Sequence, residues 1–104
     1  MDPDKSGQGY KQIVDLNKSS NYLLEFEYST RPGISLKENS FSVFFNGEEV
    51  VRIRPGKQGR EKVRKEVYGK KGENILEFLD EGVEIHYGCG IDNVGLYEIR
   101  VIID

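Results

Sequence analysis

The chain has 104 residues, and 18 Asp and Glu against 15 Lys and Arg give it a net charge of −3 at neutral pH. This length corresponds to one domain with a small core, and the acidic balance argues against a nucleic-acid-binding protein. Only 37% of the residues are hydrophobic, but 11% are aromatic, which argues against disorder and suits a two-layer β core. No stretch reaches the roughly 18 apolar residues of a membrane span.

A single cysteine, Cys89, and a single histidine, His86, narrow the possible chemistry. One cysteine cannot form an internal disulfide, and one His with one Cys is too small a ligand set for zinc. No spacing indicates a catalytic triad, and no pair of acids lies in a stretch that predicts the cleft of a glycosidase. The sequence therefore predicts a protein that is not an enzyme.

The first third of the chain predicts two strands. Residues 1–8 are polar and are expected to be a disordered or expression-derived lead, ahead of a single module over residues 9–104. Residues 9–16 alternate weakly and suit an edge strand. From residue 22 the alternation is strict, which predicts a strand with one core face and one wet face. Four large side chains fall on the core face: Tyr22, Leu24, Phe26 and Tyr28.

A turn at Pro32-Gly33 follows and places Arg31 at the rim beside this strand. The planar guanidinium of Arg31 can bind ligand hydroxyls or a carboxylate, or it can pair with a local acid such as Glu27. Both readings stay open.

Asn46-Gly47 is the strongest hairpin signal of the chain and centres a hairpin over residues 41–54. A two-residue turn and a three-residue loop with a glycine bulge are both possible. The three-residue loop gives the cleaner apolar face, because it places Phe41 and Val43 beside the segment 49–53. On that register three apolar residues lie outward or at the tip: Phe44, Phe45 and Val50.

Basic residues gather between residues 52 and 71, where nine of the 15 Lys and Arg fall and only Glu61 and Glu66 oppose them. Such a segment can attract a polyanion or the acidic surface of a second copy. Its alternation over residues 62–68 favours the simpler interpretation, a solvated strand with its charges outward.

Residues 73–80 predict a further strand, with Leu76 and Phe78 on its core face. A loop of acids follows, and the last run, residues 88–103, is rich in β-formers. Apolar residues at both odd and even positions of that run predict a closing strand covered on both faces, in the middle of a sheet. Asp92 lies within it, so its carboxylate must be compensated by backbone N–H groups, a cation or a metal.

Residues 90–96, Gly-Ile-Asp-Asn-Val-Gly-Leu, resemble the closing signature of a galactose-binding-like β-jelly-roll family, found as modules in RTX-type adhesins and other secreted or surface proteins. Three upstream stretches match in the same order: residues 12–16, 21–33 and 41–51. The resemblance implies an all-β, two-sheet antiparallel sandwich, jelly-roll-like, with about seven to eight strands. It also implies a non-catalytic binding or adhesion module, extracellular or at the cell surface.

The same resemblance implies a structural calcium near Asp92. The acids Asp80 and Glu84 are the candidates to complete its oxygen ligands, since calcium takes six to eight of them. Members of the family usually have an additional strand, ahead of the segment matched by residues 12–16, that carries part of this site.

Together these observations predict a non-catalytic carbohydrate-binding module of a larger secreted or surface protein. The alternative is a structural or protein-adhesion module that binds no sugar and is braced by calcium. The expected partner is a glycan or a neighbouring protein domain, without nucleic acid and without membrane insertion. Candidate ligand contacts lie on the strand and loop rims: Tyr28, Arg31, Asn46, Arg52 and Tyr87.

Overall fold

The computed structural model describes residues 9–30, 33, 40–80 and 90–99, and within them it contains strands and no helix. No described segment is therefore a helix that could cross a bilayer. Seven strands are formed in this part of the chain: β1 (Gly9–Leu16), β2 (Ser20–Ser29), β3 (Phe41–Phe45), β4 (Glu48–Ile53), β5 (Arg60–Gly69), β6 (Gly72–Asp80) and β7 (Gly90–Glu98).

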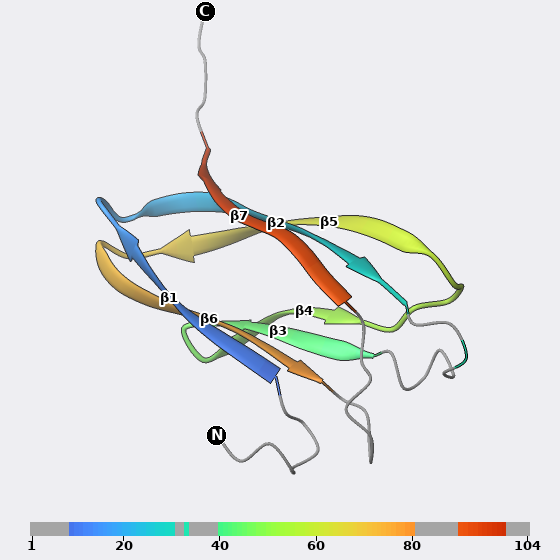
Figure 1. The fold of residues 1–104 in the computed structure, drawn as a ribbon. Coiled ribbons are helices and arrows are strands. Elements are labelled where there is room, and N and C mark those ends of the chain that lie inside the picture. The colour runs from blue at the N-terminus through green and yellow to red at the C-terminus, as the bar shows by residue number, and fades with distance from the viewer. Residues whose placement is uncertain (1–8, 31–32, 34–39, 81–89, 100–104) are drawn as a thin grey trace, which may run out of the picture.

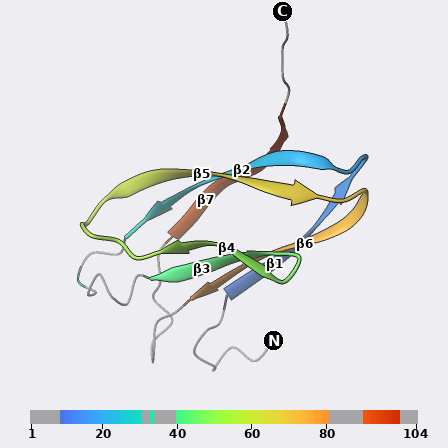
Figure 2. The same ribbon diagram turned by 180° about the vertical axis from the view of Figure 1, so that it is seen from behind.

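The seven strands form two antiparallel layers that lie face to face (Figures 1 and 2). Sheet A has the strand order β1-β6-β3-β4, and sheet B has the order β5-β2-β7. The predicted all-β, two-sheet antiparallel sandwich is confirmed. The expected edge position of residues 9–16 is also confirmed, because β1 pairs with β6 at the margin of sheet A.

The core lies between the sheets and follows from the alternation of β2. Leu24 and Phe26 are fully buried, while Glu25 between them faces outward. The ring of Phe26 crosses from sheet B to meet Phe78 of sheet A edge-on, with 5.3 Å between the ring centroids. The buried apolar residues form one cluster: Tyr22, Leu24, Phe26, Phe41, Val43, Phe45, Val67, Leu76 and Phe78.

The β3–β4 hairpin turns through two residues, Asn46 and Gly47, whose φ angles are +54° and +85°. Phe45 pairs with Glu48 across this turn. Positive φ at both central residues is the mark of a type I′ turn, which matches the twist of the flanking strands. The prediction of a three-residue loop is therefore wrong.

The extra residue lies instead inside β4, at Val50, where the register with β3 shifts between Val43 and Phe44. This bulge restores the two apolar pairs that the three-residue loop was predicted to give, Phe41 with Ile53 and Val43 with Val51. Phe45 was expected outward or at the tip and is buried, because it shares the inward parity of Val43 along β3.

Substituting valine for Gly47 is expected to lower the free energy of unfolding by more than about 1 kcal/mol, since a β-branched side chain is strained at positive φ. Gly56 is the matched control, because nothing lies near its Cβ position and its φ is outside the left-handed region. Urea unfolding of the two valine variants measures the difference. Equal stability of the two would contradict the role assigned to the turn.

Strand β7 departs from its prediction, because it lies at the margin of sheet B and not between two of the described strands. Its register with β2 shifts beside Asn93, whose φ is +53°. This bulge switches the parity of the strand, so Ile91 before it and Leu96 after it both pack against the core. Apolar residues on both parities therefore reflect a bulge in a strand with one buried face.

Candidate functional site

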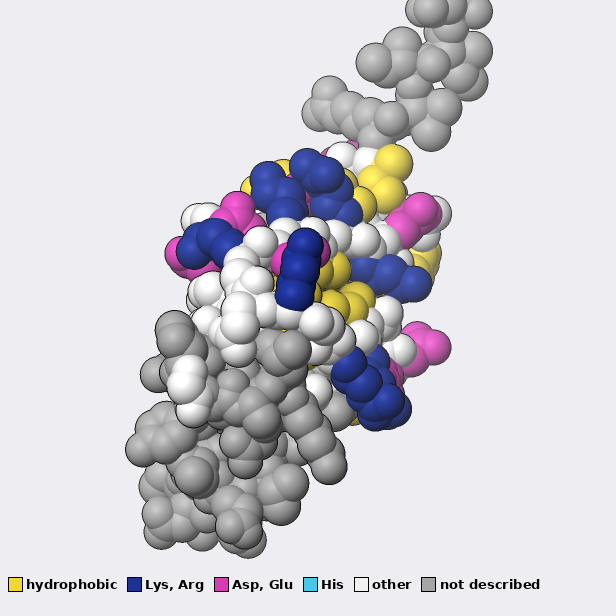
Figure 3. Space-filling model, turned by 90° about the vertical axis from the view of Figure 1, so that its right-hand side faces the viewer, with side chains coloured by type: hydrophobic (Ala, Val, Ile, Leu, Met, Phe, Trp, Pro, Cys, Tyr) yellow, Lys and Arg dark blue, Asp and Glu magenta, His cyan; other side chains and the backbone are white. Residues whose placement is uncertain are grey.

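The outer face of sheet B carries ion-paired charged residues and exposed tyrosines. Because β2 buries alternate residues, those between them point away from the core and align with outward residues of β5 and β7. Figure 3, which views the molecule from the right-hand side of Figure 1, shows Lys and Arg side chains at the top, where this sheet lies, and others on the flanks and at the lower right of the described surface.

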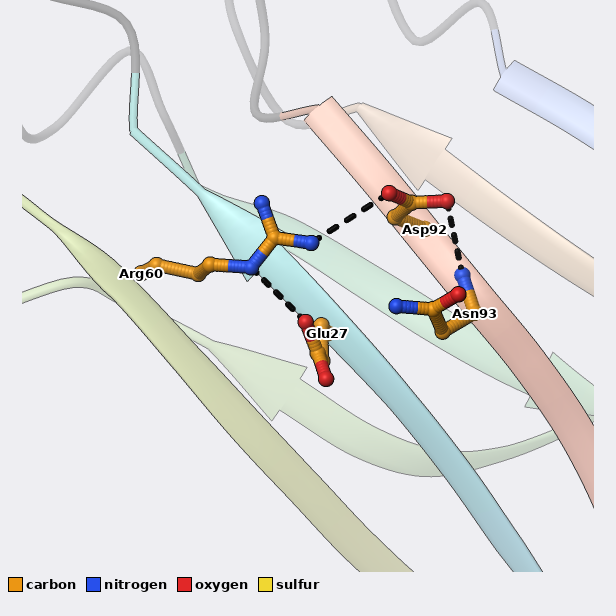
Figure 4. A network of polar contacts seen from close by, with 4 residues as sticks. All are labelled: Glu27, Arg60, Asp92 and Asn93. Carbon is orange, nitrogen blue, oxygen red and sulfur yellow. Dashed lines mark hydrogen bonds and ion pairs between the residues drawn. The ribbon is translucent and has the colours of Figure 1, made fainter.

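A cluster at one end of this face joins all three strands. The Nε of Arg60, on β5, donates to Glu27 Oε1 of β2 at 2.7 Å, and its Nη2 donates to Asp92 Oδ2 of β7 at 3.2 Å. Figure 4 shows the Arg60 guanidinium lying between the two carboxylates. The backbone N–H of Asn93 donates to Asp92 Oδ1 at 2.9 Å, so the bulge itself helps to orient this acid.

The cluster has a clear electrostatic signature. The hydrogen bond from Arg60 holds the pKa of Glu27 below its ordinary value of 4.5, with a smaller contribution from the Asn93 side chain. The two carboxylates in turn raise the pKa of Arg60, Glu27 more than Asp92. The charged forms of Glu27 and Arg60 therefore stabilise each other.

The lowered pKa of Glu27 predicts a pH dependence of stability. Its contribution is fully present above about pH 4.5 and is lost as the pH falls through the lower pKa of the folded state, because protonation removes the charge that Arg60 binds. The difference in melting temperature between the native chain and Arg60→Gln should therefore shrink below that pH. Lys70→Gln, which removes a positive charge from a turn, is the control. A difference that stays constant down to pH 3 would contradict this prediction.

The basic segment predicted between residues 52 and 71 does not present unbroken positive charge. On the outer face of sheet B, Arg64 donates to Glu25 at 2.7 Å, beside the Arg60 cluster. Elsewhere Arg52 pairs with Glu49, at 2.8 Å. The solvated strand predicted over residues 62–68 matches the exposed residues of β5, and Glu25 of β2 pairs with Arg64 there. Polyanion binding through this segment stays a prediction, and these ion pairs disfavour it.

Two exposed tyrosines lie at the other end of the face. Tyr97 on β7 and Tyr68 on β5 are 52% and 64% exposed. A Cβ atom built on Gly95 would lie 2.5 Å from the Tyr97 hydroxyl oxygen and 2.8 Å from its Cε2. The Tyr97 ring therefore leans back along β7 over Gly95, where any larger residue would displace it.

The structure does not bring the predicted ligand contacts together. Tyr28 points inward, and its ring meets Phe41 with 5.8 Å between centroids. Asn46 is held by β6, since its Nδ2 donates to Asn74 Oδ1 at 2.9 Å and its Oδ1 accepts from Ile75 N at 2.8 Å. None of the described candidates lies on the outer face of sheet B. Arg52 is on β4 of sheet A, and Arg31 and Tyr87 lie outside the described residues.

Of the three predicted metal ligands, the structure describes the side chain of Asp92 alone. Its expected compensation is confirmed, by Arg60 and by a backbone N–H, but its side chain is 66% exposed because it faces outward on a marginal strand. Each oxygen of Asp92 thus accepts one hydrogen bond, from Arg60 and from the backbone N–H of Asn93. No three acidic, His or Cys side chains of the described residues converge on a metal site. Glu84 and the side chain of Asp80 lie outside that description, so calcium stays a prediction.

Sequence reasoning missed this face, although two signals for it were present. Glu25 and Glu27 fall between the core residues of the strand that begins at residue 22, and an antiparallel partner rich in Arg is their natural complement. Gly95 and Tyr97 are two residues apart on one strand, so they share a face and the ring can reach over the glycine.

No known protein-family profile matches the sequence, and no curated protein matches it. Two solved structures are similar in fold, and both are family 35 carbohydrate-binding modules. One, from an environmental isolate, has a TM-score of 0.69 at 12% identity, covering 89% of this chain and 67% of its own. The other, from Clostridium thermocellum, has a TM-score of 0.67 at 14% identity, covering 93% and 75%. The chain thus has the β-sandwich fold of these modules, in agreement with the galactose-binding-like resemblance of its sequence.

Proposed function

We propose that the chain is a non-catalytic carbohydrate-binding module of a larger secreted or surface protein. The observation that carries the proposal is the fold shared with two family 35 carbohydrate-binding modules over 89% and 93% of the chain. The outer face of sheet B supports it independently. That face holds exposed tyrosines and ordered charged groups on rigid strands, and aromatic faces and charged hydrogen-bonding groups are what sugar rings and hydroxyls bind.

A second candidate function is a structural or protein-adhesion module without sugar binding. The observation in its favour is an apolar pair on the outer face of sheet A, where Ile13 on β1 lies directly opposite Ile75 on β6 and both are exposed. Paired exposed aliphatic residues suit a protein contact better than a hydrophilic sugar.

A glycan array separates the two functions. The chain, displayed in multivalent form because single modules bind weakly, is applied to neutral and anionic glycans. Sugar binding predicts retention on a related subset of glycans, without release of reducing ends on prolonged incubation. Absence of any retained glycan, together with self-association that Ile13→Asp abolishes, would overturn the proposal in favour of adhesion.

A further inference from the structure

We propose that the outer face of sheet B binds an uncharged oligosaccharide chain that runs across the strands, from Tyr97 over Leu23 to Tyr68. This inference rests on the proposed function, and it assigns to that function a site and a class of ligand.

Tyr97 provides the first contact. Its ring lies over Gly95 and remains 52% exposed, so part of the ring lies against the sheet while the rest is open to a ligand. A tyrosine held in this way loses little conformational entropy when a sugar ring packs on it. Gly95 is thus a positioning residue, because only the absence of its side chain leaves room for the tyrosine.

Tyr68 provides the second contact, and its distance from Tyr97 favours an oligosaccharide over a single sugar. Tyr97 lies opposite Leu23, and Tyr68 lies opposite Asn21, two residues further along β2. Two strand spacings of about 4.8 Å and two residue steps of about 3.4 Å place the two tyrosine Cα atoms about 12 Å apart. A single sugar ring cannot touch both tyrosines, whereas an oligosaccharide can. Leu23, half-buried between them, supplies an apolar floor.

The charges beside the tyrosines favour an uncharged ligand. Glu25 is the residue opposite Gly95, and it binds Arg64 at 2.7 Å. An anionic sugar would have to compete with this carboxylate for the guanidinium. Sugar hydroxyls, in contrast, can add to the pair, because a guanidinium has five N–H donors and a carboxylate about four acceptor sites.

Affinity electrophoresis and calorimetry test the site, with hydroxyethyl cellulose, galactomannan and the best-retained neutral glycan of the array as neutral probes and polygalacturonate as the anionic one. Tyr97→Ala and Tyr68→Ala should each weaken neutral binding about tenfold, equivalent to about 1.4 kcal/mol. Gly95→Ala should also weaken it, by displacing the Tyr97 ring. Ile13→Ala alters the other sheet and should bind as the native chain does. Tyr97→Phe and Tyr68→Phe keep the rings, so each should weaken binding less than the alanine substitution at the same position.

The outcomes separate the site from the function. Neutral binding that survives both alanine substitutions, in variants with native melting temperatures, would overturn the site and leave carbohydrate binding standing. Binding to polygalacturonate and to no neutral glycan would overturn the ligand class. A chain that binds no glycan at all would overturn both the site and the proposed function.

Discussion

Replacing Phe26 by alanine is expected to lower the free energy of unfolding by about 3 to 5 kcal/mol. Phe26 is fully buried, and its ring contacts Phe78 and Phe41 of the opposite sheet, with 5.3 and 6.0 Å between centroids. Truncation would therefore remove the aromatic contacts that join the two layers and leave a cavity between them. Because a domain of this size has a total stability of about 5 to 15 kcal/mol, the loss is a large share of the whole.

Urea unfolding followed by circular dichroism measures this loss, and Phe44→Ala provides the matched control. Phe44 is the same residue type on β3, but it faces outward and is half-buried. Its truncation should cost clearly less than that of Phe26. Equal losses at the two positions would show that the aromatic core does not couple the sheets.

The strands were predictable where the pattern is local. The alternation of β2 fixes which of its side chains are buried, and the Asn46-Gly47 pair fixes where the chain reverses. The bulges at Val50 and Asn93 were not predictable, because each depends on the pairing partner. The bulge at Asn93 explains why β7 was predicted in the wrong position. A strand with one buried face and a bulge, and a strand buried on both faces, both have apolar residues at odd and even positions.

The outer face of sheet B was harder to predict than the fold because it depends on register between distant residues. Arg60 and Glu27 are 33 residues apart, and their contact exists only in the observed pairing of β2 with β5. Sequence reasoning favoured loop and rim residues, which often carry function. Asn46 was a candidate ligand contact, but its side-chain amide hydrogen-bonds to β6 instead and so ties the hairpin turn to that strand. The role of Asn46 in the turn therefore explains why an asparagine is found at this position.

Asn74→Ala is the second substitution with a large expected effect, about 3 kcal/mol of lost stability. Asn74 is completely buried on β6. Its Nδ2 donates to the backbone oxygens of Lys70 at 2.8 Å and Gly72 at 3.0 Å, and its Oδ1 accepts from Lys70 N at 3.0 Å and from Asn46 Nδ2 at 2.9 Å. One side chain thus joins the β5–β6 turn to the tip of the β3–β4 hairpin. Its removal leaves several buried polar groups unsatisfied, at about 1 to 3 kcal/mol each before relaxation.

Asn74→Asp separates these hydrogen bonds from simple packing, because it preserves the shape of the side chain. A buried carboxylate can still accept from Lys70 N and Asn46, but it cannot donate to the oxygens of Lys70 and Gly72, which it would repel. The aspartate variant should therefore be strongly destabilised at pH 7 and should regain part of the loss at pH 4, where protonation restores one donor. Asn17→Ala, in the exposed β1–β2 turn, should be close to neutral. An aspartate variant as stable as the native chain at pH 7 would show that the volume of Asn74 matters and its hydrogen bonds do not.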